Sequence, residues 1–127
     1  YFSNHPKLSF ALLAHIRYLV SHGLNYRYCT DLNKHILTKL GLGEDDIRKM
    51  EADPSQSLLE ENESAMLAFV VNSVKAPGSV TEADIKKLKE LGWAQRDMVD
   101  ALAQGVSMID HAIMMEVFKM DQNCMIG

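Results

Sequence analysis

The sequence has little cysteine, little proline and few aromatic residues. Its 127 residues include two cysteines and three prolines, and 7% of them are aromatic. Two cysteines exclude a disulfide scaffold and any four-cysteine zinc or iron–sulfur site. The longest apolar run of note, Met66 to Val71, is far shorter than the ~20 residues that span a bilayer. We therefore expect no membrane-spanning segment.

An excess of positive charge is also lacking. The formal net charge is −4, which argues against a general nucleic-acid or anionic-membrane binder. With 47% hydrophobic residues the chain can form a core, and its length suits one domain spanning 1–127. The start has no charged segment followed by an apolar core, so we expect no signal peptide and a cytoplasmic protein with reduced thiols. It also lacks an initiator Met, so a longer native chain is possible.

Apolar residues recur at three- and four-residue spacing, and no segment shows sustained two-residue alternation. The pattern predicts an all-α domain of about six helices. Gly23, Gly41, Gly43 and Gly92 are expected stops, and Thr81 to Asp84 resembles a capping box. The expected helices are Leu8–His22, Cys29–Leu40 (with Leu32, Ile36, Leu37 and Leu40 on one face), Glu44–Met50, Leu58–Val74, a helix from the Thr81 cap to Leu91, and one from Ala94 or Gln95 to Lys119.

The last of these helices is apolar nearly all round. Such a helix is either central in its own domain or covered by a partner subunit. The pattern favours a homo-oligomer. Methionines concentrate there and serve as adaptable packing at a core or an interface; six of the eight lie on or just after this helix: Met98, Met108, Met114, Met115, Met120 and Met125.

Cys29 is the first candidate for chemistry. It stands at the expected start of a helix, where the free amides and the positive dipole end favour a thiolate, and Arg27 is close in sequence. The alternative is a small buried hydrophobe, as most free cysteines are. Cys124 lies near the end of the chain and is more typical of a mobile terminal thiol.

The histidines give no ligand pattern. His15 and His22 are seven residues apart and share a helix face, but no metal-binding spacing supports a site. The side chains of Asp110 and His111 diverge on a helix and cannot form an oriented dyad. No phosphate-binding glycine loop or nucleophile elbow is present, so we expect no metal and no cofactor.

Several of these features together resemble the alkylhydroperoxidase D-like, carboxymuconolactone decarboxylase family. They are an amphipathic helix, a short Asn-containing connector, a cysteine at a helix start, and the segment Gly41 to Ile47. A later stretch of the chain is similar to peroxidase-related members of the family. The residues that carry this similarity are Val80 to Ile85, Leu88, Leu91 to Trp93, Met98 and Val99. The whole resemblance covers about Leu8 to Met120.

The family's motif is Asn-x-Cys-x-x-Cys-x-x-x-His, and it is incomplete here. The resemblance places the second motif cysteine on Cys29, the first on Tyr26 and the histidine on Asn33. The family's upstream glutamate falls near Ala14 or His15. Because Tyr26 replaces the first motif cysteine, the family's disulfide cannot close, and an Asn amide can hydrogen-bond the sulfur but cannot act as an acid or base.

The resemblance implies a peroxidase that uses one cysteine. Cys29 would reduce a hydroperoxide and be regenerated by an external thiol or by Cys124. Tyr26, Arg27 and Tyr28 would line the approach.

Two further interpretations stay open. The first is a cofactor-free lyase of the decarboxylase branch, which needs an acid or base from His15, His22 or His35. The second is a non-catalytic oligomer of the same fold that binds a small apolar ligand or a partner protein. The oligomer in each case would be a dimer, trimer or hexamer, and the sequence does not decide among them.

Overall fold

The chain is helical over most of the residues that the computed structural model describes, 7–23 and 27–118, with side chains described for 7–23 and 30–118. This part of the chain contains six α-helices, two short 3₁₀ turns and no strand, which confirms the all-α prediction for these residues. The elements are α1 (Phe10–Gly23), α2 (Arg27–Lys39), α3 (Glu44–Ala52), η2 (Pro54–Gln56), α4 (Glu61–Lys75), η3 (Pro77–Ser79), α5 (Glu82–Glu90) and α6 (Gln95–Val117).

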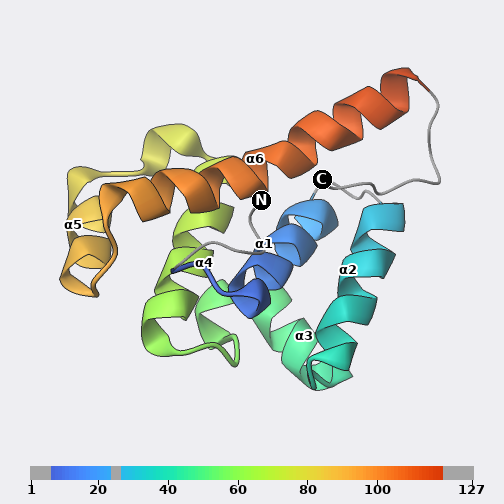
Figure 1. Ribbon diagram of the computed structural model, residues 1–127, viewed down its shortest axis with the longest axis horizontal. Coiled ribbons are helices and arrows are strands. Elements are labelled where there is room, and N and C mark those ends of the chain that lie inside the picture. Colours follow the sequence, from blue (N-terminus) through green and yellow to red (C-terminus); the bar gives the residue numbers. More distant parts are fainter. Residues whose placement is uncertain (1–6, 24–26, 119–127) are drawn as a thin grey trace.

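Helix α1 lies in the middle of the fold. It packs against α2 on one side and against α4 and α6 on others, while α3 lies below and α5 leans on α4 (Figure 1). Its predicted apolar face is confirmed, because all five of its residues are buried; they are Leu12, Leu13, Ile16, Leu19 and Val20. This helix contributes more buried apolar side chains to the core than any other described helix. Each Å² of apolar area that is removed from water stabilises the fold by about 25 cal/mol.

Local signals fix most helix ends as predicted. The backbone φ of Gly41 is 102° and that of Gly92 is 100°, a left-handed conformation that glycine adopts without strain after a helix. At the start of α5, Thr81 and Asp84 form the predicted capping box, with the Thr81 hydroxyl accepting from the Asp84 amide. Gly41 and Gly92 therefore determine where α2 and α5 end, and the capping box determines where α5 begins, independently of tertiary contacts.

Helices α4 and α6 approach closely at Gly105. A Cβ placed on Gly105 would lie 2.8 Å from Val70 Cγ1 and 3.5 Å from atoms of both Val20 and Val74. The absence of a side chain therefore lets α6 lie directly on α1 and α4.

Three predicted helix starts are wrong by two or three residues. Helix α1 begins at Phe10 rather than Leu8, α2 at Arg27 rather than Cys29, and α4 at Glu61 rather than Leu58. Ahead of α4, the Ser64 hydroxyl donates to the Leu59 carbonyl and lies 2.7 Å from the Ser57 hydroxyl. These bonds hold the preceding residues in a turn, which leaves Leu58 exposed.

The predicted buried face of α2 is also wrong in part. Leu32 and Leu40 are 44% and 43% exposed, whereas Asn33 and Leu37 are buried. Because α2 packs mainly on α1, only a narrow stripe of it is covered. The spacing correctly predicted an amphipathic helix, but it included Leu32 and Leu40 in the buried face and left out Asn33.

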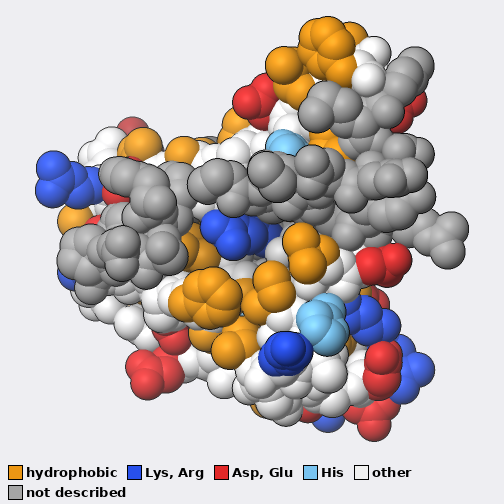
Figure 2. All heavy atoms as spheres, turned by 45° about the vertical axis from the view of Figure 1, so that its right-hand side comes forward, with side chains coloured by type: hydrophobic (Ala, Val, Ile, Leu, Met, Phe, Trp, Pro, Cys, Tyr) orange, Lys and Arg blue, Asp and Glu red, His pale blue; other side chains and the backbone are white. Residues whose placement is uncertain are grey.

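Helix α6 is not enclosed by its own domain. Its end projects past the other helices (Figure 1), and Figure 2 shows apolar side chains gathered on that projecting end. The interpretation of α6 as a fully covered central helix is therefore wrong for the described residues, although Met98, Met108 and Met115 are buried. Its exposed apolar residues, together with the one that follows it, are Val99, Val106, Ile113, Met114, Val117 and Phe118. None of the described helices is both long and apolar enough to cross a lipid bilayer.

Candidate functional site

The predicted thiol site lies partly outside the described residues. Tyr26 is outside them, and Cys29 is the third residue of α2, with only its backbone described. Asn33 stands one helical turn after Cys29 and is only 1% exposed. The buried stripe of α2 thus runs through Asn33 and Leu37, on the register that also contains Cys29.

His15 is buried in α1. Its Nδ1 lies 2.6 Å from the Ala11 carbonyl oxygen, and because a carbonyl only accepts, Nδ1 carries the proton and donates it. Its Nε2 has no hydrogen-bond partner among the described residues. Burial lowers the pKa of His15, so the ring is neutral at neutral pH.

A cluster of three polar side chains, Tyr18, His22 and Glu51, lies where α1 meets α3. The Tyr18 hydroxyl donates to Glu51 Oε2, and His22 Nδ1 lies 3.8 Å from the same oxygen. The rings of Tyr18 and His22 stack, with centroids 5.8 Å apart and planes inclined by 21°. One carboxylate oxygen therefore faces a phenol and an imidazole that are themselves held together.

Tyr18 acts in this cluster only as a donor. Its side chain is buried, and burial raises the pKa of Tyr18, with the hydrogen bond to Glu51 raising it further. A phenol that stays protonated keeps Glu51 in place as an acceptor. The Glu51 side chain is 23% exposed and that of His22 48%, so both reach solvent or a ligand.

This cluster opens on a cavity of about 500 Å³, a volume within the ~300–1,000 Å³ range of small-molecule pockets. The cavity lies between the ends of α1 and α3, the C-terminal half of α4 and one residue of α6. Its walls are mostly apolar, and its polar groups are few. Its lining includes His22 and Glu51 on one side and Asn72 and Lys75 on another, with Val71 and Ile109 among the apolar walls.

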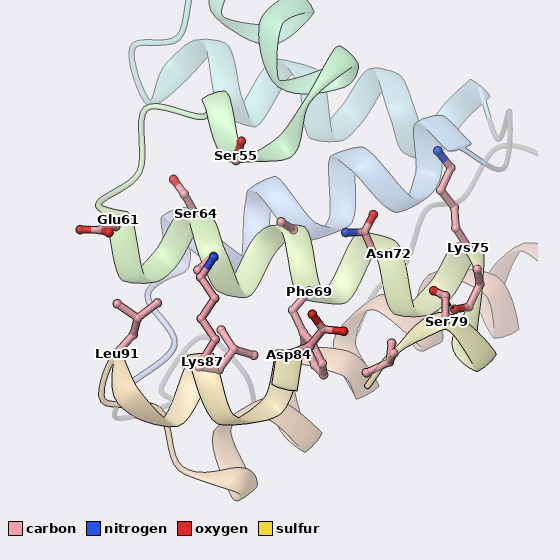
Figure 3. Close-up of a pocket in the computed structure, with 15 residues that line it drawn as sticks. Ser55, Glu61, Ser64, Phe69, Asn72, Lys75, Ser79, Asp84, Lys87 and Leu91 are labelled. Atoms are coloured by element: carbon pink, nitrogen blue, oxygen red, sulfur yellow. Dashed lines mark hydrogen bonds between the residues drawn. The ribbon is translucent and has the colours of Figure 1, made fainter. Parts of the chain in front are cut away.

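A larger hollow of about 590 Å³ lies between α4 and α5. Figure 3 shows Phe69 reaching from α4 toward α5, with Asp84 and Lys87 rising from α5. It contains no histidine, and its acidic and basic side chains stand at an open rim. It is therefore a less specific site for chemistry than the cavity at His22.

The other two histidines considered for acid–base chemistry, His15 and His35, do not lie beside a carboxylate on the wall of a described cavity. His35 is exposed on α2, and His15 lies in the core rather than on a cavity wall. No cluster of three metal-ligating side chains occurs within the described part of the chain. Of the three histidines considered for acid–base chemistry, His22 is the one that lines a described cavity.

Comparison with known proteins gives no relative. No protein-family model, no curated protein and no solved structure matches the chain. The resemblance to the alkylhydroperoxidase D-like family therefore rests on the sequence motifs alone.

Sequence reasoning missed Glu51 and Tyr18. The spacing of Tyr18 and His22, four residues apart on α1, was a usable signal that the two side chains are neighbours. Glu51 comes from α3 and meets them only through the packing of α3 against the end of α1. No local pattern could have identified it.

Proposed function

We propose that this protein is a thiol-dependent hydroperoxide reductase of the alkylhydroperoxidase D-like type that works with one cysteine, Cys29. The observation that carries the proposal is the position of Cys29 in the first turn of α2, the helix that packs on α1. A cysteine in a first turn is close to free backbone amides and to the positive end of the helix dipole. Both favour the thiolate, which is the nucleophile.

The reaction has two parts. The Cys29 thiolate attacks one oxygen of the hydroperoxide, so that an S–O bond forms, the O–O bond breaks and the alcohol leaves after taking up a proton. The resulting sulfenic acid condenses with an external thiol, releasing water and forming a mixed disulfide. A second external thiol then restores Cys29 by thiol–disulfide exchange. The chemistry needs no metal or cofactor.

Asn33 supports this proposal as a buried amide one turn after Cys29. An amide does not titrate, so it would stabilise the sulfur or the leaving oxygen by hydrogen bonding and not by proton transfer. His15, buried and neutral, occupies the neighbourhood of the family's glutamate but does not supply a carboxylate.

We also propose that the protein is a homo-oligomer. The support is the exposed apolar surface at the end of α6, where Ile113 is 57% and Val117 60% exposed. A second copy packing there would remove this surface from water.

The test of the proposed function is peroxide consumption with an excess of a small thiol. We expect the Cys29→Ser variant to lose at least about 100-fold of the rate, as removal of a reacting nucleophile does, and Cys124→Ser to retain it. Alkylation rates measured against pH should also give a pKa for Cys29 below the free-thiol value of ~8.5. Equal peroxide consumption by the wild type and Cys29→Ser would refute the proposal.

A second candidate function, the cofactor-free lyase, requires an acid or base in a pocket. The specific observation in its favour is that His22 and Glu51 line one cavity.

A further inference from the structure

The cavity between α1, α3 and α4 combines three chemical features. It has a histidine beside a carboxylate, a lysine beside an amide, and apolar walls between them. Each feature constrains the ligand separately. None of them involves Cys29.

The basic side is formed by His22 and Glu51. The Nδ1 atom of His22 is the one that faces Glu51, so a tautomer with the proton on Nδ1 would leave the Nε2 lone pair to accept a proton from a ligand. The separation of 3.8 Å is longer than a hydrogen bond, and such contacts commonly tighten when a ligand binds. Tyr18 fixes this geometry, since it stacks on His22 and donates to Glu51.

The anion-binding side is formed by Lys75 and Asn72 of α4. Figure 3 shows the Lys75 side chain extending from the end of α4 away from α5, and both Lys75 and Asn72 line this cavity as well as the larger hollow. None of the carboxylates in the described residues lies within ion-pair distance of the Lys75 ammonium. A cation with no counter-ion in the described part of the chain, one turn from a side-chain amide on the same helix, suits a ligand carboxylate.

The other acidic group of the cavity does not compete for a cation. Asp53 Oδ1 accepts from the backbone amide of Ser55 at 3.1 Å and from its hydroxyl at 2.8 Å. The carboxylate of Asp53 thus closes the turn into η2. The remaining surface comes from Leu19, Val20, Val71, Val74 and Ile109, which favours a short hydrocarbon chain.

We propose that this cavity binds a small oxo acid with an apolar chain, and that His22 moves a proton on the carbon next to its carbonyl. Lys75 and Asn72 hold the carboxylate and the carbonyl oxygen. The hydrocarbon chain lies against the apolar walls. Glu51 and Tyr18 are positioning residues that act through His22.

The proton transfer is balanced without a co-reactant. The C–H bond next to the carbonyl breaks, and its proton goes to His22 Nε2. The electron pair forms a carbon–carbon double bond while the carbonyl electrons move to oxygen, where the Asn72 amide donates to the developing charge. His22 Nε2 then exchanges this proton with solvent, and return of a solvent proton to the same carbon completes the exchange.

The experiment follows hydrogen–deuterium exchange of α-ketocaproate in heavy water by proton NMR, using the whole chain without peroxide or thiol. We expect the protein to exceed the buffer rate by about 100-fold, the usual contribution of a placed acid–base group. His22→Gln should return the rate to within about tenfold of buffer. His35→Gln, an exposed histidine on α2, is the matched control and should exchange like the wild type.

The lysine is tested in the same assay. Lys75→Gln should raise the half-saturating concentration of α-ketocaproate about tenfold, as loss of a charged hydrogen bond does. Lys87→Gln, on the wall of the other hollow, is its control. Methyl butyl ketone, which lacks the carboxylate, should saturate poorly with the wild type and be indifferent to Lys75→Gln.

Three results would overturn the inference. They are a wild-type rate equal to buffer, a His22→Gln rate equal to wild type, and equal saturation by the oxo acid and the ketone. For the positioning role, Glu51→Gln should lower the maximal rate with an unchanged half-saturating concentration. A change only in half-saturation would contradict that role. Because no thiol takes part, these outcomes are independent of the peroxidase proposal.

Discussion

The phenol of Tyr18 donates a hydrogen bond to the carboxylate of Glu51, 33 residues later in the chain. This bond joins α1 to α3, two helices that are separated in the sequence by α2, and it brings the carboxylate to His22. It couples the stability of the fold to the geometry of the cavity, because the same carboxylate oxygen faces both side chains.

The Tyr18–Glu51 bond predicts a loss of stability in Tyr18→Phe. Removing the hydroxyl leaves Glu51 without its buried donor and should lower the free energy of unfolding by about 1.5–3 kcal/mol, the range for a hydrogen bond to a charged group. Urea unfolding measures it. Glu51→Gln keeps an acceptor for the phenol and should lose less. Equal losses in the two variants would show that packing, and not this bond, is being measured.

Burial of Tyr18, together with the same bond, makes stability fall at alkaline pH. The pKa of Tyr18 in the folded chain lies above its ordinary value of 10.0, so loss of the proton favours the unfolded chain. The stabilisation is complete below pH 10 and is lost as the pH rises above it. Unfolding free energies of the wild type and Tyr18→Phe should therefore converge above that value. A constant difference would contradict the prediction.

His15 should make the protein less stable in acid. Burial lowers its pKa from the ordinary 6.5, so protonation favours the unfolded chain, and its contribution is complete above pH 6.5 and is lost below it. In His15→Gln the slope of unfolding free energy against pH just below 6.5 should decrease by at most about 1.4 kcal/mol per pH unit. The exposed His35 offers the control, His35→Gln, whose slope should match the wild type.

Much of the fold could be predicted because its signals are local. The apolar spacing of α1 gives its buried face directly, and left-handed glycines at Gly41 and Gly92 end helices whatever packs around them. The exposure of Leu32 and Leu40 could not be predicted in the same way. Periodicity indicates an amphipathic helix, but how much of the face is covered depends on how many neighbours the helix has.

The candidate site could be predicted less well, because its parts come from separate elements. Cys29 and Asn33 are near each other in sequence, and a motif can identify them. Glu51 meets His22 only after α3 folds back on α1. A side chain contributed by a distant helix leaves no trace in local spacing, so the cavity became visible only in the structure.

The exposed end of α6 predicts self-association. Light scattering should give a mass that is a multiple of the 14.3 kDa chain. Ile113→Glu places a charge on the apolar surface and should shift the mass to that of one chain, because burying an unpaired charge at an interface is unfavourable. Val99→Glu changes an equally exposed residue near the start of α6 and should leave the assembly intact. A single-chain mass for the wild type would refute the homo-oligomer.

Gly105 predicts a steric limit where α4 and α6 meet. Alanine usually stabilises a helix interior relative to glycine by about 1 kcal/mol, but here its Cβ would lie 2.8 Å from Val70 Cγ1. Valine is stiff at χ1 and cannot swing aside, so the overpacking cost of about 1–3 kcal/mol should exceed the gain. Gly105→Ala should therefore lower the midpoint of urea unfolding, whereas Gly78→Ala, with no atom within 4 Å of its Cβ, should change it little. Combining Gly105→Ala with Val70→Ala removes the clashing methyl groups, and the double variant should lose less stability than the two single losses added together. Strict additivity would mean that the contact between these two residues does not limit the approach of the helices.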